Sequence, residues 1–337
     1  MKIIKPSVEI LEQEPGLIGV YKQIEVAGRT CYKSEDKITD TSAEAFVKAR
    51  IDTGHTAMLE HGTVYLEFSL VNKTDDELKH IYNEIDFFDR QPNSLVVIGA
   101  GRWSFVTTNY RVLLENNSLD LLDNICEPTQ YHPKRTSVRF ICDRGVSHEL
   151  VRHRVFSFAQ ESTRYCNYGK DKFDNNISII CPVNPYEEEF KSDWDNNNLR
   201  ISKLRPAWSE WVKSQKLIEK TYLRMVDNGL YGIQPQIARS ILPTSLKTEV
   251  IMTGFDDDWQ GRIIVYQKDN NYLMVECIPY TKKNMERCSE IYADKSRWAI
   301  VVNGFFPLRT APSAHPQMQE LAIPLKEMFI KAGKIEE

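Results

Sequence analysis

The stretch ELVRHRVFSFAQESTRYCNY, residues 149–168, determines how this chain is interpreted. In it, Arg152-His153-Arg154 is followed after seven residues by Ser162, and then by Arg164. Guanidinium forks match the oxygens of phosphates and carboxylates, and an imidazole and a hydroxyl add further hydrogen bonds. The stretch therefore predicts an anion-binding active site.

The charge around this stretch is opposite to that of the whole chain. Residues 134–164 hold seven Lys or Arg and three acids, whereas the chain of 337 residues has a formal net charge of −4. A local excess of cations in an acidic protein favours a small anionic ligand over a polyanion. A solvated basic turn is the alternative for a lone Arg-His-Arg, but it does not explain the Ser and Arg that follow.

Residues 146–156 are predicted to form a helix that carries the Arg-His-Arg triplet, because apolar residues recur there at helical spacing. Consecutive helical residues point about 100° apart, so Arg152 and Arg154 would diverge while Glu149 and His153 share a face. One copy of the chain could not then direct all three basic side chains into one pocket. We therefore expect pockets built between subunits.

The pattern Arg-His-Arg-x7-Ser, continued by Arg164-Tyr165, resembles the signature of the flavin-dependent thymidylate synthases. Further segments agree with that family in the same order along the chain. They are Arg29-Thr-Cys-Tyr-Lys33, His55 with Leu59-Glu60-His61, Arg239-Ser-Ile-Leu-Pro243, Phe305-Phe-Pro-Leu-Arg309 and His315-Pro-Gln317. The resemblance implies an α/β (α+β) fold, with a mixed or antiparallel sheet flanked by helices, as a single domain over residues 1–337.

The resemblance also implies the reaction: reductive methylation of dUMP to dTMP, with methylenetetrahydrofolate as carbon donor and NADPH as reductant through FAD. It places Cys31, His55, Arg152, His153 and Arg154 at the flavin, where cations offset the negative charge of a reduced ring. The side chains that it places around dUMP are Glu149, Gln160, Ser162, Arg164, Arg239 and Arg309. A homotetramer with shared sites is expected on the same grounds.

Physical chemistry supports these roles. A nucleotide phosphate is a dianion, and charge-assisted bonds from Arg164, Arg239 or Arg309 are worth about 1.5–3 kcal/mol each. Methyl transfer to C5 of uracil requires polarised ring carbonyls, for which Arg164 and Gln160 are the candidates. Ser162 is assigned to binding, because a serine nucleophile needs an adjacent base. Gln160, Ser162, Arg164 and Arg309 are thus the residues expected at the reacting base.

The chain departs from the family pattern in three places. Ala159 and Gln160 stand where relatives often have Asn and Glu, and Glu149 replaces a common Gln. The residues that relatives offer to flavin after the Leu-Pro segment fall on Phe255 and Asp257, and neither is carried over.

Residues 261–303 separate Gln260 from the Phe305 segment, whereas the family's chain runs on directly. They are predicted to form an inserted subdomain whose first and last strands pair antiparallel and bring its ends together. Its elements, in order, are a strand at 262–267, a turn at Asp269-Asn270, a strand at 272–279, a helix at 282–293 and a strand at 298–302. A tolerated surface insertion, a partner-binding or regulatory module and a broken active site are the alternatives.

Other elements are predicted from pattern alone. Residues 74–88 read as an acidic helix, residues 94–105 as a strand and turn, and residues 107–111 as the start of another helix capped by Thr107 or Thr108. Residues 208–225 read as an amphipathic helix whose apolar face packs on the core.

Composition narrows the class of protein. No apolar run approaches the roughly 20 residues of a membrane span, and MKIIKPSVEI lacks a signal-peptide core. Seven cysteines without a Cys-x-x-Cys pair fit a reducing compartment, and the histidine pairs lack the spacing of a metal site. We expect a cytoplasmic protein without membrane, metal or nucleic-acid contacts.

Three alternative functions remain open from the sequence. An Arg-rich nucleic-acid-binding protein would use the basic stretch on phosphates. A catalytically impaired relative would bind nucleotide or flavin, or act through residues 261–303. A folate-only synthase would attack uracil with a cysteine, but Cys166 and Cys181 are not in its Pro-Cys-His setting.

Overall fold

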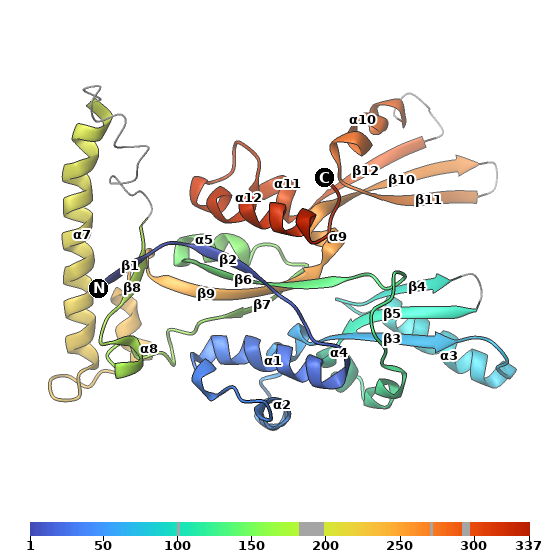
Figure 1. The fold of residues 1–337 in the computed structure, drawn as a ribbon, viewed down its shortest axis with the longest axis horizontal. Coiled ribbons are helices and arrows are strands. Elements are labelled where there is room, and N and C mark those ends of the chain that lie inside the picture. The colour runs from blue at the N-terminus through green and yellow to red at the C-terminus, as the bar shows by residue number, and fades with distance from the viewer. Residues whose placement is uncertain (100–101, 182–198, 270–271, 292–296) are drawn as a thin grey trace.

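The computed structural model describes residues 1–99, 102–181, 199–269, 272–291 and 297–337 (Figure 1). Its helices are α1 (Gly16–Tyr32), α2 (Ser42–Asp52), α3 (Asp75–Asp89), α4 (Tyr110–Glu115), α5 (Arg144–Leu150), α7 (Leu199–Val226), α8 (Pro235–Ala238), α9 (Asp256–Gln260), α10 (Lys282–Ile291), α11 (Phe305–Arg309) and α12 (Pro316–Lys331). Its strands are β1 (Lys2–Ile4), β2 (Ser7–Leu11), β3 (Thr63–Ser69), β4 (Leu95–Gly99), β5 (Trp103–Asn109), β6 (Arg135–Asp143), β7 (Ser157–Gln160), β8 (Ser178–Ile180), β9 (Lys247–Phe255), β10 (Gly261–Asp269), β11 (Tyr272–Pro279) and β12 (Arg297–Asn303). Antiparallel sheets and flanking helices confirm the predicted α/β class.

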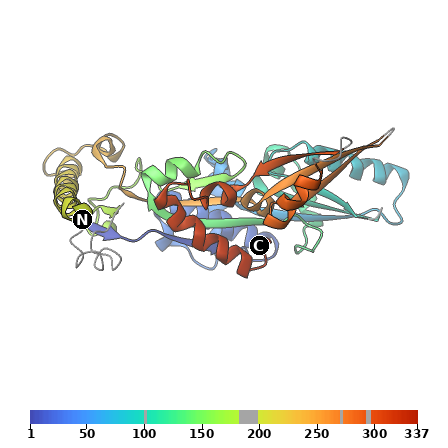
Figure 2. The same ribbon diagram turned by 90° about the horizontal axis from the view of Figure 1, so that it is seen from above.

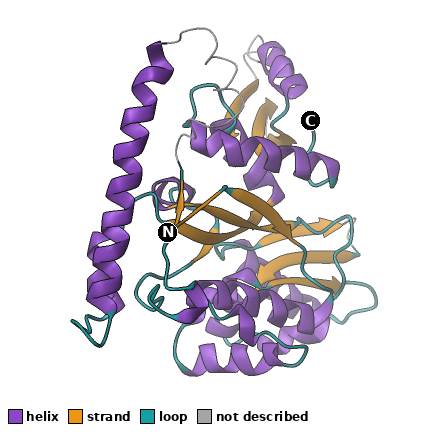
Figure 3. Ribbon diagram, turned by 60° about the vertical axis from the view of Figure 1, so that its left-hand side comes forward, coloured by secondary structure: helices purple, strands orange, loops and turns teal. Residues whose placement is uncertain are grey.

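An antiparallel sheet of order β2-β6-β9-β7 lies at the centre. Successive strand residues point to opposite faces, and β9 uses both. Val250 and Met252 join the core under α12, while Ile251 packs with Ala27 of α1 on the other side. Figures 1 and 3 show the consequence, with α11 and α12 over one face of the sheet and α1 over the other.

An aromatic cluster fixes the segment that carries Arg309. Trp259 is fully buried, and its ring centroid lies 4.7 Å from that of Phe156 and 5.1 Å from that of Phe305. Buried aromatic rings of this size each contribute a large apolar area to the core. Because Phe305 is held in this cluster, α11 and the Arg309 at its end have a defined position.

A second antiparallel sheet, of order β3-β5-β4, packs with α3 and α4. The acidic helix predicted at 74–88 is confirmed as α3, and Thr74 caps it in a reciprocal capping box with Glu77. The predicted cap of the next helix was wrong. Thr107 and Thr108 belong to β5, where both are buried, and Asn109 caps α4 by accepting a 3.2 Å hydrogen bond from the Val112 amide.

Residues 261–303 form a β-β-α-β unit, as predicted, with strand order β11-β10-β12 and α10 beside them. β10 and β12 pair antiparallel, with Gly261 opposite Asn303, so the two ends of the unit meet. The unit has a small core of its own around Ile263, Val265 and Ala299. In Figures 1 and 2 it extends away from the central sheet. Asn270 of the predicted turn lies outside the described residues.

The amphipathic helix predicted at 208–225 is confirmed within α7. Its buried Tyr222 and Val226 pack on Ile179 of β8, which pairs in parallel with β1. Figure 3 shows α7 standing along one side of the molecule. In the described part of the chain, no helix combines the length and the apolarity that crossing a membrane requires.

Removing residues 261–303 and joining Gln260 to Gly304 should leave a folded protein, because the unit's ends adjoin and its core is separate. Urea unfolding followed by circular dichroism should keep one cooperative transition. Val265→Asp in the intact chain is the matched control: Val265 is 2% exposed, so the change should disrupt the unit alone. Aggregation of the deletion variant would instead show that the unit supports the main core.

Candidate active site

The Arg-His-Arg triplet lies in a turn, not in a helix. α5 begins after Asp143, whose Oδ1 accepts a 2.8 Å hydrogen bond from the Val146 amide, and it ends at Leu150. The helix predicted over residues 146–156 was therefore wrong beyond Leu150. The reason is tertiary: Phe156 packs on Trp259 and β7 starts at the next residue, so the chain must turn before it.

Arg309 brings together Glu149 and His153, which the predicted helix was expected to place on one face. Its Nε donates to His153 Nε2 at 2.9 Å, its Nη1 to Glu149 Oε2 at 2.8 Å and its Nη2 to the Glu149 carbonyl oxygen at 3.1 Å. Because Nε2 of His153 accepts, the ring proton belongs on Nδ1. Burial, and secondly the Arg309 charge, lower the pKa of His153 from 6.5 to about 4, so the ring is neutral at physiological pH.

A cavity of about 330 Å³ opens beside this triad. Glu149 lines it together with Thr244, His315 and Gln317, which come from two distant segments. The Gln317 side-chain amide donates to Asp143 Oδ2 at 2.8 Å and thereby joins α12 to the cap of α5. Three segments of the sequence-predicted site thus surround one cavity.

A second group forms where α1 ends. The Cys31 carbonyl accepts a 3.0 Å hydrogen bond from the Ser162 amide. This bond holds residues 161–165, called the serine loop below, against that end of the helix. Next to it, the Tyr32 hydroxyl and His55 Nδ1 lie 2.8 Å apart. The structure therefore brings the predicted flavin residues Cys31 and His55 close to the predicted substrate residue Ser162.

The arginines of the signature are exposed. The Arg164 guanidinium carbon lies 5.5 Å from the centre of the Tyr165 ring, and Arg239 Nη1 lies 3.5 Å from Thr163 Oγ1, which places Arg239 by the serine loop. Within the described residues, neither guanidinium has a carboxylate partner. Both can therefore meet an anion without first breaking an ion pair.

Arg152 and Arg154 are also exposed, and the described residues give them no ion pair. The structure thus separates the triplet, with His153 turned inward to Arg309 and the two arginines at the surface. This arrangement fits the predicted division of the triplet between sites, although the helical geometry that suggested it was wrong.

Gln160 presents an acceptor where the sequence suggested a donor. Its amide nitrogen donates to Ser147 Oγ at 2.9 Å and to Thr248 Oγ1 at 3.1 Å, which uses both N–H groups. Its Oε1 is left to accept. In this arrangement Gln160 can hold an N–H of a pyrimidine, whereas polarising a carbonyl would need a donor.

Sequence reasoning missed a buried ion network under the serine loop. Lys33 bridges Glu35 at 2.6 Å and Glu249 at 2.8 Å, while Lys247 bridges Glu249 and Glu161, the latter at 2.9 Å. Burial alone would raise the pKa of Glu249, but Lys247 and Lys33 outweigh it and lower that pKa. Lys247-x-Glu249 within an apolar strand was the available signal, because such a strand rarely buries charges unless they are paired.

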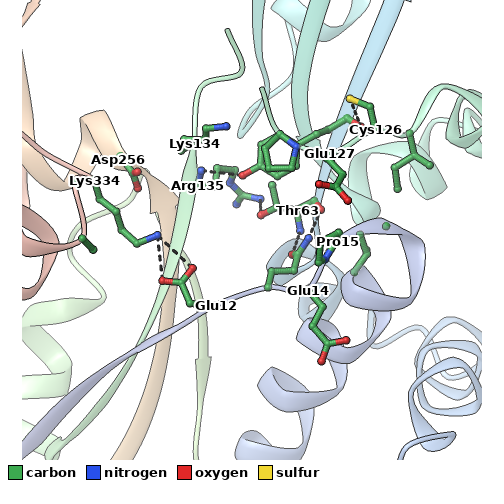
Figure 4. Close-up of a pocket in the computed structure, with 18 residues that line it drawn as sticks. Glu12, Glu14, Pro15, Thr63, Cys126, Glu127, Lys134, Arg135, Asp256 and Lys334 are labelled. Atoms are coloured by element: carbon green, nitrogen blue, oxygen red, sulfur yellow. Dashed lines mark hydrogen bonds and ion pairs between the residues drawn. The ribbon is translucent and has the colours of Figure 1, made fainter. Parts of the chain in front are cut away.

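A larger cavity, of about 440 Å³, contains none of the residues predicted to bind flavin or dUMP (Figure 4). Charges of both signs line it. Burial lowers the pKa of Arg135 to about 10, and burial raises that of Asp256 to about 7. Arg135 Nη1 donates to the Glu60 carbonyl oxygen at 3.2 Å.

In the described residues, no group of three or more His, Cys, Asp or Glu side chains is placed to hold a metal ion.

Comparison with known proteins supports the signature. Residues 132–255 match the family described as "Thymidylate synthase complementing protein". The flavin-dependent thymidylate synthase of Pyrococcus furiosus is 28% identical over 112 residues, which cover 33% of this chain and 37% of that protein. That of Corynebacterium efficiens is 23% identical over 251 residues, covering 72% of this chain and 65% of that protein. The matches thus span between 37% and 65% of the length of these relatives.

The solved structure of the UMP/dUMP methylase PolB from Streptomyces cacaoi, bound with 5-Br dUMP, aligns with 99% of this chain and 93% of that one. The identity is 13% and the TM-score is 0.37, which is too low to support an argument. In sequence, the chain is similar to the flavin-dependent thymidylate synthases, and the resemblance predicted from the signature is confirmed.

Lys247→Met should lower the free energy of unfolding by about 3 kcal/mol, because it leaves the buried Glu161 and Glu249 without their shared cation. Urea unfolding at pH 7 measures the change. Below pH 4.5, the ordinary pKa of Glu249, wild type should lose the network's contribution as the pH falls through the depressed pKa.

Lys213→Met is the matched control for that variant. Lys213 pairs with Glu210 on the exposed face of α7, where a salt bridge contributes about 1 kcal/mol or less. Equal losses in the two variants would contradict the structural role assigned to the buried network.

His153 should titrate near pH 4 in an NMR titration of the imidazole signals. In the unfolded chain, His153 becomes protonated near pH 6.5. The contribution of neutral His153 to the stability of the folded state should therefore be lost as the pH falls from 6.5 to about 4. Arg309→Met should raise the pKa of His153, because it removes the neighbouring charge. Arg224→Met, which alters an exposed arginine of α7, should leave it unchanged; equal shifts would exclude the contact with Arg309 as a cause.

Proposed function

We propose that the protein is a flavin-dependent thymidylate synthase that converts dUMP to dTMP, with methylenetetrahydrofolate as carbon donor and NADPH as reductant through FAD. The observation that carries the proposal is the meeting of signature segments far apart in sequence. Arg309 binds Glu149 and His153, and the Cys31 carbonyl binds Ser162. The family match over residues 132–255 supports the same reading.

The substrate would be held by the serine loop. Arg239, which has no ion pair within the described residues, offers its guanidinium group to the phosphate, and Arg309 retains one N–H on each terminal nitrogen beside Glu149. Gln160 would accept from the N3–H of uracil, which orients the base, and Arg164 would polarise a ring carbonyl. Ser162 binds, because no described base contacts its hydroxyl, and its Oγ already accepts from the Arg164 amide.

The residues present fit a flavin. Arg152 and Arg154 are exposed and unpaired in the described chain, and Tyr32 with His55 offers a stacked pair of rings, 6.4 Å between centroids, beside the serine loop. When bound, FAD would carry the hydride taken from NADPH. The neutral His153 would donate from Nδ1, and the arginines would offset negative charge on the reduced ring.

The site would be shared between copies of the chain. Arg152 and Arg154 are exposed on a turn from which only His153 points inward to Arg309. We propose that the two arginines complete the site of another copy in a homotetramer located in the cytoplasm. Residues 261–303 would be an inserted unit within a single domain, outside the catalytic machinery.

Of the two cysteines considered for the folate-only alternative, Cys166 is disfavoured as a nucleophile, and the thiol of Cys31 at the end of α1 resembles it. Cys166 is fully buried, and burial raises the pKa of its thiol to about 12, so the thiolate is scarce at physiological pH. Burial, followed by the Glu161 charge, also raises the pKa of Cys31. Neither thiol is therefore prepared to attack uracil.

Anaerobic dTMP formation from dUMP, methylenetetrahydrofolate and NADPH, with and without FAD, tests the proposed reaction. Product should form only with FAD. A folded, flavin-loaded protein that makes no dTMP would favour the impaired-relative alternative, for which the engagement of Arg309 by Glu149 is the first suspect.

Arg164→Ala should weaken dUMP binding at least tenfold and leave flavin binding unchanged, since a charge-assisted bond is worth about 1.5–3 kcal/mol. Isothermal titration with dUMP, and flavin absorbance, measure the two effects. Arg224→Ala is the matched control, because Arg224 is exposed and lies 5.8 Å from the Tyr231 ring centre, much as Arg164 lies over Tyr165. Unchanged dUMP affinity in Arg164→Ala would overturn the assignment.

A further inference from the structure

A basic groove lies beside the second group of site residues, between the end of α1, the α2 helix and the turn that follows Asn167. Its volume is about 700 Å³. Five cationic side chains line it against one acid, Asp36, in a chain whose net charge is −4. The cations that define the basic groove are Arg29, Lys37, Arg50, Lys170 and Lys172.

Four of these five cations have no ion pair within the described residues. Arg29 is paired with Glu25 at 3.0 Å, and Lys172 donates only to the Lys33 carbonyl oxygen at 2.8 Å. Lys37 and Lys170 are exposed. By contrast, the network beneath the serine loop pairs both of its lysines with carboxylates. The groove thus holds a concentrated positive charge that the rest of the described chain leaves uncompensated.

Arg50 provides an independent sign of a ligand site. Its Nε is buried and makes no hydrogen bond, and its guanidinium lies 5.2 Å from the ring centres of both Tyr32 and Phe46. Aromatic faces attract a cation, but they satisfy none of its N–H groups. The terminal nitrogens of this guanidinium, for which the described residues provide no hydrogen bond, are therefore held in place to bind an anion in the groove.

The groove adjoins the proposed active site through Tyr32. Tyr32 lines the groove, and its hydroxyl lies 2.8 Å from His55 Nδ1. Its ring also contacts that of Tyr165, with centroids 5.6 Å apart, next to Arg164. A molecule whose reacting end lies at His55 and the serine loop could therefore extend an arm past Tyr32 into the groove.

We propose that the basic groove binds an oligoanionic arm, a chain of carboxylates or phosphates, of a reactant whose ring system occupies the adjoining site. This inference rests on the proposed function, which supplies two such molecules: a folate with a carboxylate tail and a dinucleotide with phosphates. Lysine side chains spaced along an open groove tolerate variable length, whereas Arg50 fixes the position nearest the site.

The test compares Lys37→Gln/Lys170→Gln with Lys216→Gln/Lys220→Gln. The second pair removes two exposed lysines of α7 that form no ion pair with any described residue and lie far from the groove in sequence, so both variants change the net charge equally. Direct titrations measure the affinities of tetrahydrofolate carrying one or five γ-linked glutamates, and of FAD against FMN. Repeating them at higher salt measures the electrostatic contribution.

Wild type should bind the longer-armed member of one pair more tightly, and the groove variant should lose that preference about tenfold. Loss of the glutamate preference identifies the folate tail, and loss of the FAD preference identifies the dinucleotide. Unchanged preferences in the groove variant, or equal losses in the α7 variant, would overturn the proposal. So would a groove variant that loses only affinity for a single-stranded oligonucleotide, which would mark a nucleic-acid surface.

These titrations need no turnover. If wild type makes no dTMP but keeps a groove-dependent preference for the longer arm, the proposed reaction fails while the groove assignment stands. If dTMP forms but the groove variant keeps its preferences, the proposed reaction stands and the groove assignment fails.

Discussion

The candidate site depends on the buried ion network that joins α1, β9 and the serine loop. Lys33 ends α1 in a left-handed conformation, with φ of 48°, and its ammonium binds Glu249 on β9. Lys247 then connects the same glutamate to Glu161, the residue before Ser162. Charges removed from water are costly unless each has a partner, so these four side chains fix one another. The Cys31 carbonyl and the Ser162 amide meet because this network holds both ends.

A second constraint is the guanidinium of Arg309. It replaces the hydrogen bonds that a longer helix would have given the Arg-His-Arg turn, and it sets the tautomer of His153. Its partner Glu149 stands where the family resemblance implies a Gln. A carboxylate there forms an ion pair that an amide could not, so the same substitution that tightens the turn also occupies part of a proposed phosphate ligand.

Cations with a structural role differ in burial and in pairing from the cations assigned to ligand binding. Cations that shape the fold, such as Lys33, Lys247 and Arg309, are at least half-buried and paired. Cations assigned to ligands, including Arg164 and those of the basic groove, are mostly exposed and without ion pairs in the described chain. Positive charge is therefore concentrated where the end of α1 meets the serine loop, which suits the anionic reactants of the proposed function.

The sequence by itself determined the family resemblance, through the order and spacing of its signature residues, and the β-β-α-β unit of residues 261–303, through strand and helix periodicity. Each signature segment and each element of the unit is local, so neighbouring residues suffice to specify it. The sequence also predicted the acidic helix at 74–88, which the structure shows to be capped by a capping box within its first turn.

Only the tertiary structure decided where α5 ends, because the burial of Phe156 against Trp259 overrides helical spacing. It alone decided that Asn109, and not a threonine, caps α4, since pairing with β3 draws Thr107 and Thr108 into β5. The same holds for Arg309, which lies more than a hundred residues from its partners. Contacts of that kind depend on how separate elements pack, and no local pattern records them.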